Sequence, residues 1–310
     1  MKRRRRVWWF LAFVTVAGGY LGYLFTWRHE LPAAPAHARV KPALTTLPTL
    51  SVCWLETGKI FDNTGSSLLI RHPKGDLLVD AGNSSHFADE VAGYAWRDRF
   101  WLRALPGALG PSLLLPAALT AAGADPAKVQ LLISHAHIDH VGGLMDLPSA
   151  TVVWMAQPEL DWVSLGHGAE GVGVVPAHAA RLKGHMQPLQ FVDTPYEIFD
   201  QHADLFGDGS VVVVPLYGHT PGSVGVFVNI TPTQRLFHVG DAAHDWRGLE
   251  KRLSEAPILV RTNWDTKRSE DVLAALSAYH EAAPEIAMLP AHARQAWLRA
   301  FGAPNHCRDR

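Results

Sequence analysis

The 310-residue chain contains little cysteine, few charged residues and no excess of either sign of charge. Its two cysteines are too few for a disulfide scaffold or a cysteine-rich zinc module. With 28 Lys+Arg against 29 Asp+Glu, the chain lacks the basic surplus that nucleic-acid binding normally requires. Apolar residues at 48% and charged residues at 18% exclude a disordered chain and a polytopic membrane protein. Histidine, by contrast, is abundant at 17 copies, and histidine titrates near neutral pH and ligates metals.

The N-terminus is predicted to attach the protein to a membrane. Residues 1–6 form a basic tail, and residues 7–27 carry no charge. At about 1.5 Å per helical residue this run can cross a hydrocarbon core of about 30 Å. The positive-inside rule then places the tail in the cytoplasm and the rest of the chain on the exterior or periplasmic side. The alternative is a signal peptide, cleaved at small residues within 34–38 to give a secreted protein, but the run exceeds the usual apolar region of about 7–15 residues.

The rest of the chain divides into three predicted parts. Residues 28–48 are rich in proline and alanine and predict a linker, residues 49–303 a hydrolase domain, and residues 304–310 a tail. Cys53 and Cys307 lie near the two ends of the domain. In an oxidising exterior they could form a disulfide, or Cys53 could simply be buried in a strand.

The domain shows the pattern of an α/β protein. Apolar, partly β-branched runs predict strands at 68–70, 77–79, 129–133, 151–154 and 211–215, and helical patterns appear at 113–122 and 270–281. A tight turn at 73–76 indicates antiparallel pairing early in the chain, while later strands alternate with helices. We therefore expect a sandwich of sheets with helices outside. Segments 83–111 and 166–187 lack periodicity and are expected to be functional loops.

One short motif carries most of the chemical information. Residues 131–133 form a buried-type strand that runs into three histidines and an aspartate within six residues: His135, His137, Asp139 and His140. While the chain is extended, His135 and His137 point the same way and can bind one ion. Where the chain turns into a helix, Asp139 and His140 are redirected and can bind a second. Nitrogen and carboxylate ligands without thiolates suit Zn²⁺, with Mn²⁺ or Fe²⁺ as alternatives.

Three further candidate ligands follow other apolar strands. They are His219 in 216–222, Asp241 in 237–242 and His292 in 288–292. A single histidine after a strand is more often a hydrogen-bonded turn residue. The shared position at strand ends is what marks all three as candidate ligands.

Together these motifs, with residues 78–82 upstream, resemble the metallo-β-lactamase-fold hydrolase superfamily. The resemblance covers nearly the whole domain and implies an αβ/βα four-layer sandwich, here preceded by one transmembrane helix. It further implies a dinuclear zinc site with Asp241 bridging, Asp80 orienting a ligand, and two ligand triads: His135, His137 and His219; and Asp139, His140 and His292.

The resemblance also implies a chemistry. A hydroxide shared by the two zinc ions attacks a lactone or ester carbonyl, and Asp139 or the other zinc ion assists the leaving group. True β-lactamases of this fold lack the aspartate at position 241, so antibiotic hydrolysis is not expected. Segments 66–82, 156–160 and 204–209 look more like the N-acyl-homoserine-lactone lactonase branch. Those lactonases place a tyrosine where this chain has His244, which is either a hydrogen-bond donor to the substrate or a residue at the rim of the site.

The substrate is predicted to be a small carbonyl compound with an apolar portion. This rests on apolar side chains in and beside the two loops: Phe87, Tyr94, Trp96, Phe100, Trp101, Leu102, Trp162 and Leu165. Two other functions share the metal ligands: a thioesterase of the glyoxalase II type, and a non-catalytic metal-binding protein of the same fold. The export signal counts against the first, and the complete ligand set against the second.

Overall fold

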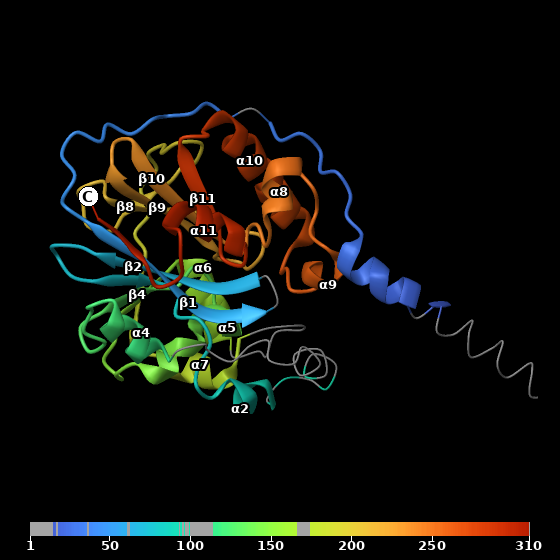
Figure 1. Cartoon of the computed structure of the whole chain (residues 1–310), viewed down its shortest axis with the longest axis horizontal. Helices are drawn as coiled ribbons and strands as arrows, with labels where there is room; N and C mark the ends of the chain where they lie inside the picture. Colours follow the sequence, from blue (N-terminus) through green and yellow to red (C-terminus); the bar gives the residue numbers. More distant parts are fainter. Residues whose placement is uncertain are drawn as a thin grey trace, which may run out of the picture.

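Two β-sheets packed face to face form the centre of the molecule (Figure 1). The computed structural model describes residues 15–16, 18–35, 37–60, 63–92, 94, 96, 99, 114–165 and 174–309. The first sheet has seven strands in the order β12-β1-β2-β3-β4-β5-β6. Their bounds are β1 (Ser51–Ile60), β2 (Asn63–Arg71), β3 (Leu77–Val79), β4 (Gln130–Leu132), β5 (Val153–Met155), β6 (Met186–Pro188) and β12 (Cys307–Asp309).

The second sheet has five strands in the order β11-β10-β9-β8-β7. Their bounds are β7 (Ala203–Asp204), β8 (Val211–Pro215), β9 (Val224–Thr231), β10 (Gln234–Gly240) and β11 (Ile286–Pro290). In the first sheet, β1 to β3 pair antiparallel and β3 to β6 pair parallel. The antiparallel pairing predicted for the early strands is confirmed.

Helices cover both outer faces. The first sheet is covered by α4 (Leu115–Ala121), α5 (Ile138–Val141), the 3-10 helix η1 (Gly142–Asp146), α6 (Gln157–Ser164) and α7 (Pro176–Leu182). The second sheet is covered by α8 (Trp246–Lys251) and α10 (Thr266–Ala282). Three further helices are α2 (Phe87–Ala92), α9 (Pro257–Val260) and α11 (Arg294–Phe301). The arrangement is the predicted four-layer sandwich.

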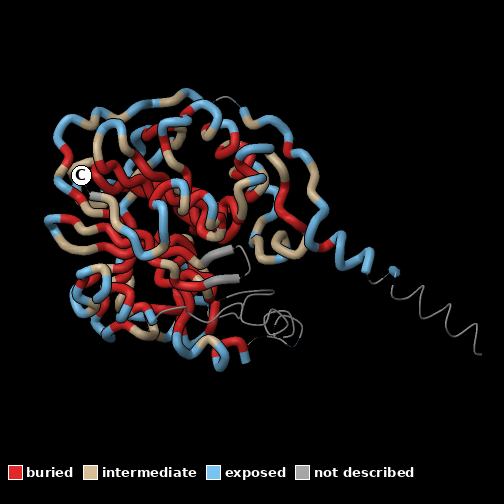
Figure 2. Tube along the Cα trace, in the orientation of Figure 1, coloured by how far each residue is buried: buried red, intermediate tan, exposed pale blue. Residues whose placement is uncertain are grey.

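Strand residues alternate between two cores. In β1, Val52 and Trp54 face the second sheet, whereas Cys53 faces the helices. In β8, Val213 belongs to the core between the sheets and Val212 to the core under α8 and α10. Because both faces of each sheet are covered, these strands are apolar at nearly every position, which is why the sequence pattern found them. Figure 2 shows the resulting buried centre.

The predicted linker is wrong for part of its length, because the described residues of 28–40 contact the domain at several points. Leu31 is 1% exposed, and Val40 pairs with Glu197 through the backbone. Arg39 forms ion pairs with the buried carboxylate of Glu197 and with Glu285. In Figure 1 this segment, which we call the strap, runs in blue over the half of the molecule that contains α10. The proline- and alanine-rich composition did not indicate that Leu31 is buried or that Arg39 pairs with a buried carboxylate.

The predicted tail at 304–310 is also part of the domain. β12 pairs antiparallel with β1 at the sheet edge, and Cys53 and Cys307 form a disulfide between the two strands. The disulfide is therefore present, and it joins the two ends of the domain.

The N-terminal anchor is only partly described. Residues 18–26 are helical, whereas the basic tail 1–6 and residues 7–14 and 17 lie outside the described residues. Within the described part of the chain, no helix is both long and apolar enough to span a bilayer.

The two segments predicted as irregular loops contain regular structure. α2 begins at Phe87 within the first, and α7 and β6 lie within the second. The remainder of both, including Phe100, Trp101 and Leu102, falls largely outside the described residues.

Candidate metal centre

The histidine motif lies where β4 ends and the chain turns into α5. His137 is the extended residue that precedes α5, so His135 and His137 lie on extended chain while Asp139 and His140 lie in the helix. The three histidines are buried, and Asp139 is about one quarter exposed, at 24% of its side chain. The change of direction predicted from the sequence is confirmed.

Asp80 holds this turn in place. It follows β3 with a φ of 58°, a left-handed conformation that aspartate tolerates better than most residues. One carboxylate oxygen accepts from the backbone N–H of Ser134 at 2.7 Å, and the other accepts from Ser134 Oγ and from His140 Nδ1, both at 2.8 Å. Because Nδ1 of His140 donates to Asp80, its Nε2 carries the lone pair that faces the site.

The glycines after the motif allow a close approach. A Cβ at Gly143 would lie 2.2 Å from the carbonyl oxygen of Ala81, and its N–H donates to Gly82 at 2.9 Å. The chain after β3 therefore packs directly on the start of η1, which brings Asp80 to His140.

Glu159 connects this loop to the one that carries His219. The Glu159 carboxylate is buried in α6 and accepts from the N–H of Ala136 at 2.7 Å, from Thr220 Oγ1 at 2.7 Å and from the N–H of Gly222 at 2.9 Å. Burial raises the pKa of Glu159 to about 7. One side chain thus sets the spacing of the two loops that supply the first ligand triad.

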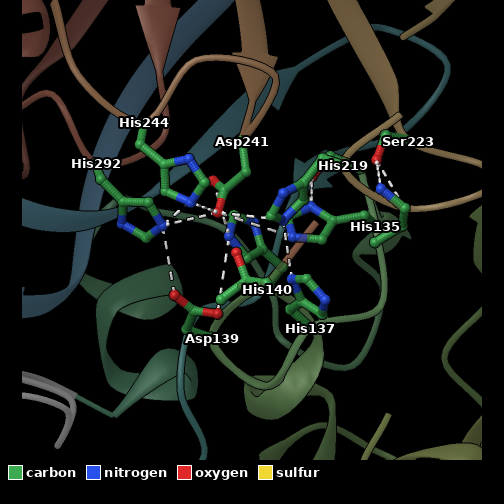
Figure 3. A network of polar contacts seen from close by, with 12 residues as sticks. His135, His137, Asp139, His140, His219, Ser223, Asp241, His244 and His292 are labelled. Carbon is green, nitrogen blue, oxygen red and sulfur yellow. Dashed lines mark hydrogen bonds and ion pairs between the residues drawn. The ribbon is translucent and has the colours of Figure 1, made fainter. Parts of the chain in front are cut away.

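Asp241 lies at the centre of the cluster (Figure 3). Its Oδ2 lies 3.6 Å from His219 Nε2 and 3.9 Å from His135 Nε2. Its Oδ1 lies 3.3 Å from His140 Nε2 and 3.2 Å from His292 Nε2. One carboxylate therefore faces both predicted triads, as a bridging ligand must.

The ligand atoms are arranged for cations rather than for one another. His135 Nε2, His140 Nε2 and Asp241 Oδ1 are buried without a hydrogen-bond partner. His219 Nδ1 donates to Asn263 Oδ1 at 2.7 Å, which leaves the lone pair of His219 on Nε2, 2.9 Å from His137 Nδ1. Neighbouring ligands of a tetrahedral zinc lie roughly 3.3 Å apart, given metal–ligand lengths of about 2.0–2.1 Å. Four groups of residues bring ligand atoms within 4.8 Å of one another: His135–His137–His219, His135–His140–Asp241, Asp139–His140–His292 and His219–Asp241–His244.

The protonation states differ between the two ligand triads. Burial lowers the pKa of His135 and His137 well below the usual value, so both imidazoles are neutral at neutral pH. Burial alone would raise the pKa of Asp241, but the neighbouring histidines, above all His292 and His140, lower it well below the usual value. Despite burial, Asp241 raises the pKa of His140 and of His292, and Glu255 raises that of His244, so a cation that binds these imidazoles would displace their protons.

His244 is the candidate residue about which the sequence was least informative. It is 8% exposed, its Nε2 lies 3.2 Å from Asp241 Oδ2, and its Nδ1 contacts the carboxylate of Glu255. It therefore lies inside the cluster and not at its rim.

Apolar side chains lie beside the metal-binding turn. Trp162 lies edge-on to His137, with 6.1 Å between ring centres, and Phe87 and Tyr94 pack with Ile138. By contrast, Trp96 and Leu165 are mostly exposed at 71% and 65%. Of the apolar residues predicted to surround the site, Trp162, Phe87 and Tyr94 therefore lie beside the metal-binding turn.

Three residues that support the ligands were not identified from the sequence. Glu159 lies in a stretch that resembled the lactonases, but its contacts to two loops could not be read from that stretch. Glu255 and Asn263 lie in a segment without a periodic pattern, and only the fold brings them to His244 and His219.

Comparison with known proteins agrees with this geometry. Residues 61–276 match the family model described as the metallo-beta-lactamase superfamily. The chain is 26% identical over 243 residues to the N-acyl homoserine lactonase AttM of Rhizobium radiobacter, covering 76% of this chain and 84% of the relative.

Two solved structures show the same fold. One is an N-acyl homoserine lactone hydrolase with the product N-hexanoyl-L-homoserine bound at its catalytic metal center; the TM-score is 0.57 at 15% identity, covering 82% of this chain and 97% of that one. The other is a probable metal-dependent hydrolase from Staphylococcus aureus, with a TM-score of 0.56 at 13% identity, covering 80% of this chain and 91% of that one.

Proposed function

The chain belongs to the metallo-β-lactamase superfamily, and we propose that it is a dinuclear zinc hydrolase that cleaves a lactone or ester carbonyl. The observation that carries the proposal is the position of Asp241, whose two oxygens face the two ligand triads. When bound there, two zinc ions would polarise a carbonyl and lower the pKa of coordinated water to about 7.

The protein's own residues supply orientation and a proton relay. Asp80, Glu159 and Asn263 fix three of the ligand side chains or their loops, so the site is organised before substrate arrives. Asp139 is more exposed than the buried ligands, and its Oδ2 lies 3.4 Å from His292 Nε2. From this position Asp139 is placed to hold a proton and deliver it to the departing alkoxide.

We propose a substrate with an apolar acyl portion. Trp162, Phe87 and Tyr94 offer aromatic surface on the side of the metal-binding turn. The lactonase relatives, named for N-acyl homoserine lactones, are consistent with such a substrate.

The test is a substrate panel with the full-length protein, before and after zinc loading. The panel contains N-hexanoyl-homoserine lactone, an aliphatic ester, a thioester and a β-lactam. We expect zinc-dependent opening of the lactone or cleavage of the ester. Zinc-loaded protein that cleaves only the thioester, or none of the four, would overturn the lactone or ester assignment.

A variant pair tests the proton relay. Asp139→Asn is expected to lower kcat by about 10²–10⁴-fold, the usual contribution of a general acid. Asp146→Asn is the matched control, because Asp146 bonds Ser85 and is not one of the candidate ligands. Equal activity of the two variants would contradict the role of Asp139.

We also propose that the protein is exported and held at the membrane by residues 7–27. The proposal is supported by the apolar run after a basic tail and by the disulfide, since disulfides persist mainly outside the reducing cytosol. Membrane fractions should contain the full-length protein, and deletion of 7–27 should abolish that association. A mature N-terminus within residues 34–40 would instead establish cleavage and secretion.

A further inference from the structure

His244 and Glu255 form a buried pair at the metal centre. Nδ1 of His244 contacts Glu255 Oε1, and the two side chains are 8% and 6% exposed. A carboxylate can only accept from the imidazole, so Nδ1 carries the proton. Nε2, on the opposite side of the ring, lies 3.2 Å from Asp241 Oδ2.

This geometry matches that of the predicted ligands. His292 Nε2 and His140 Nε2 lie 3.2 and 3.3 Å from Asp241 Oδ1, the same spacing to the same carboxylate. A divalent cation bound between His244 Nε2 and the carboxylate would take the place of a proton shared by these two atoms. His244 also belongs to one of the four groups whose ligand atoms converge, together with His219 and Asp241.

A single network orients His244 and His219. Glu255 Oε2 accepts from the side-chain amide of Asn263 at 3.1 Å, and Asn263 Oδ1 accepts from His219 Nδ1 at 2.7 Å. Glu255 therefore fixes one imidazole directly and the other through one amide. Both rings are left with Nε2 directed at the same oxygen of Asp241.

The strap holds the chain that carries Glu255. The N–H of Ser254 donates to His29 at 2.8 Å, His29 N–H donates back to Ser254 Oγ at 3.0 Å, and Arg28 donates to the Ser254 carbonyl at 2.8 Å. Arg28 also pairs with Asp245, the neighbour of His244, at 2.6 Å. The strap thus fixes Ser254, which precedes Glu255, and Asp245, which follows His244. Fixed neighbours suit a metal ligand better than a side chain that moves toward the substrate.

We propose that His244 Nε2 is an additional metal ligand, on the His219 side of Asp241, and that Glu255 is the positioning residue that directs it there. The proposal rests on the dinuclear site of the proposed function. It replaces the predicted role of His244 as a hydrogen-bond donor to the substrate. A site with this extra nitrogen ligand binds its first ion more tightly and has one coordination position fewer for substrate.

The test is Co²⁺ binding to the metal-free full-length protein, read by stoichiometry, chelator competition and the visible spectrum of the bound ion. Loss of the ligand in His244→Ala is expected to weaken the site on the His219 side by more than about 100-fold and to change the spectrum. Loss of the positioning carboxylate in Glu255→Gln is expected to weaken it about 10–100-fold. The control is His178→Ala, which removes a buried histidine paired with Glu90 at 3.0 Å; its affinity and spectrum should match the wild type.

The outcomes separate this proposal from the proposed function. Wild-type affinity and spectrum in a folded His244→Ala protein, with catalysis reduced, would overturn the ligand role and support a substrate donor. A wild-type protein that binds no Co²⁺ stoichiometrically would instead overturn the dinuclear site itself. Glu255→Gln keeps a side chain of the same shape, so it remains informative if His244→Ala does not fold.

Discussion

Removal of the Glu159 carboxylate should weaken zinc binding by His135, His137 and His219, although none of these ligands is changed. Glu159→Ala leaves three donors without their acceptor: the N–H of Ala136, the hydroxyl of Thr220 and the N–H of Gly222. Each buried donor left unsatisfied costs about 1–3 kcal/mol, which gives roughly 3–9 kcal/mol before relaxation. Water entering the space left by the side chain can satisfy part of this, so we expect a loss of about 3 kcal/mol. Glu159→Gln keeps one acceptor oxygen and leaves one N–H facing an amide, for which about 1–3 kcal/mol is expected.

Two assays measure the consequences. Urea unfolding of the metal-free protein gives the free energy, and chelator competition gives the affinity for zinc, expected to fall about 10–100-fold in Glu159→Ala. Glu90→Ala is the matched control, because it removes another buried carboxylate that contacts His178 and not the metal loops. Zinc affinity that is unchanged in Glu159→Ala, or reduced equally in Glu90→Ala, would refute the reasoning.

Three other perturbations test separate parts of the structure. Asp80→Asn leaves one acceptor oxygen where the N–H of Ser134 and His140 Nδ1 now bond to different oxygens, and should weaken zinc binding about 10–100-fold in the same competition assay. Glu197→Ala removes the carboxylate that pairs with Arg39 of the strap and with the buried Arg235, and should cost about 3–5 kcal/mol in urea unfolding. Burial would raise the pKa of Glu197, but the two arginines hold it below the usual value for glutamate. The carboxylate therefore stabilises the fold fully above the pKa of the unfolded chain, and this stabilisation is lost as the pH falls through the lower pKa of the folded protein. Acid unfolding should accordingly be steeper in the wild type than in Glu197→Gln. Cys307→Ser opens the disulfide to Cys53 and should cost about 2–5 kcal/mol, measured by urea unfolding without reductant.

Each of these expectations has a contradicting result. Zinc affinity within twofold of the wild type in Asp80→Asn would mean that His140 is oriented by other contacts. A Glu197→Ala protein as stable as the wild type would mean that the strap pair contributes little. If dithiothreitol destabilises Cys307→Ser as much as it destabilises the wild type, its effect does not come from reducing the Cys53–Cys307 disulfide.

The sheets and the ligands could be predicted because their signals are local. A strand buried on both faces is apolar at consecutive positions, as in β3 and β8. Ligands that follow such strands lie at the same edge of the sandwich, so His219, Asp241 and His292 could be grouped with the histidine motif. The structure brings the predicted ligand side chains together, and Asp80 accepts from His140 Nδ1.

The supporting contacts could not be predicted because they join distant positions without a repeating pattern. Arg28 and Asp245 are 217 residues apart, and Arg39 and Glu197 are 158 apart. Composition alone predicted a free linker, since proline and alanine carry no amphipathic period. Glu255 reaches the imidazole of His244 because the segment that carries Glu255 lies between the strap, which bonds Ser254, and α9. Apart from Asp80, the residues that orient the ligands could therefore not be predicted from the sequence.

The central claim is that Asp241 lies between two divalent cations bound by side chains from distant parts of the chain. Anomalous diffraction at the zinc edge from crystals of the zinc-loaded protein tests it most directly. We expect two peaks about 3.5–4 Å apart on either side of the Asp241 carboxylate. A single peak, or peaks away from this carboxylate, would contradict the claim.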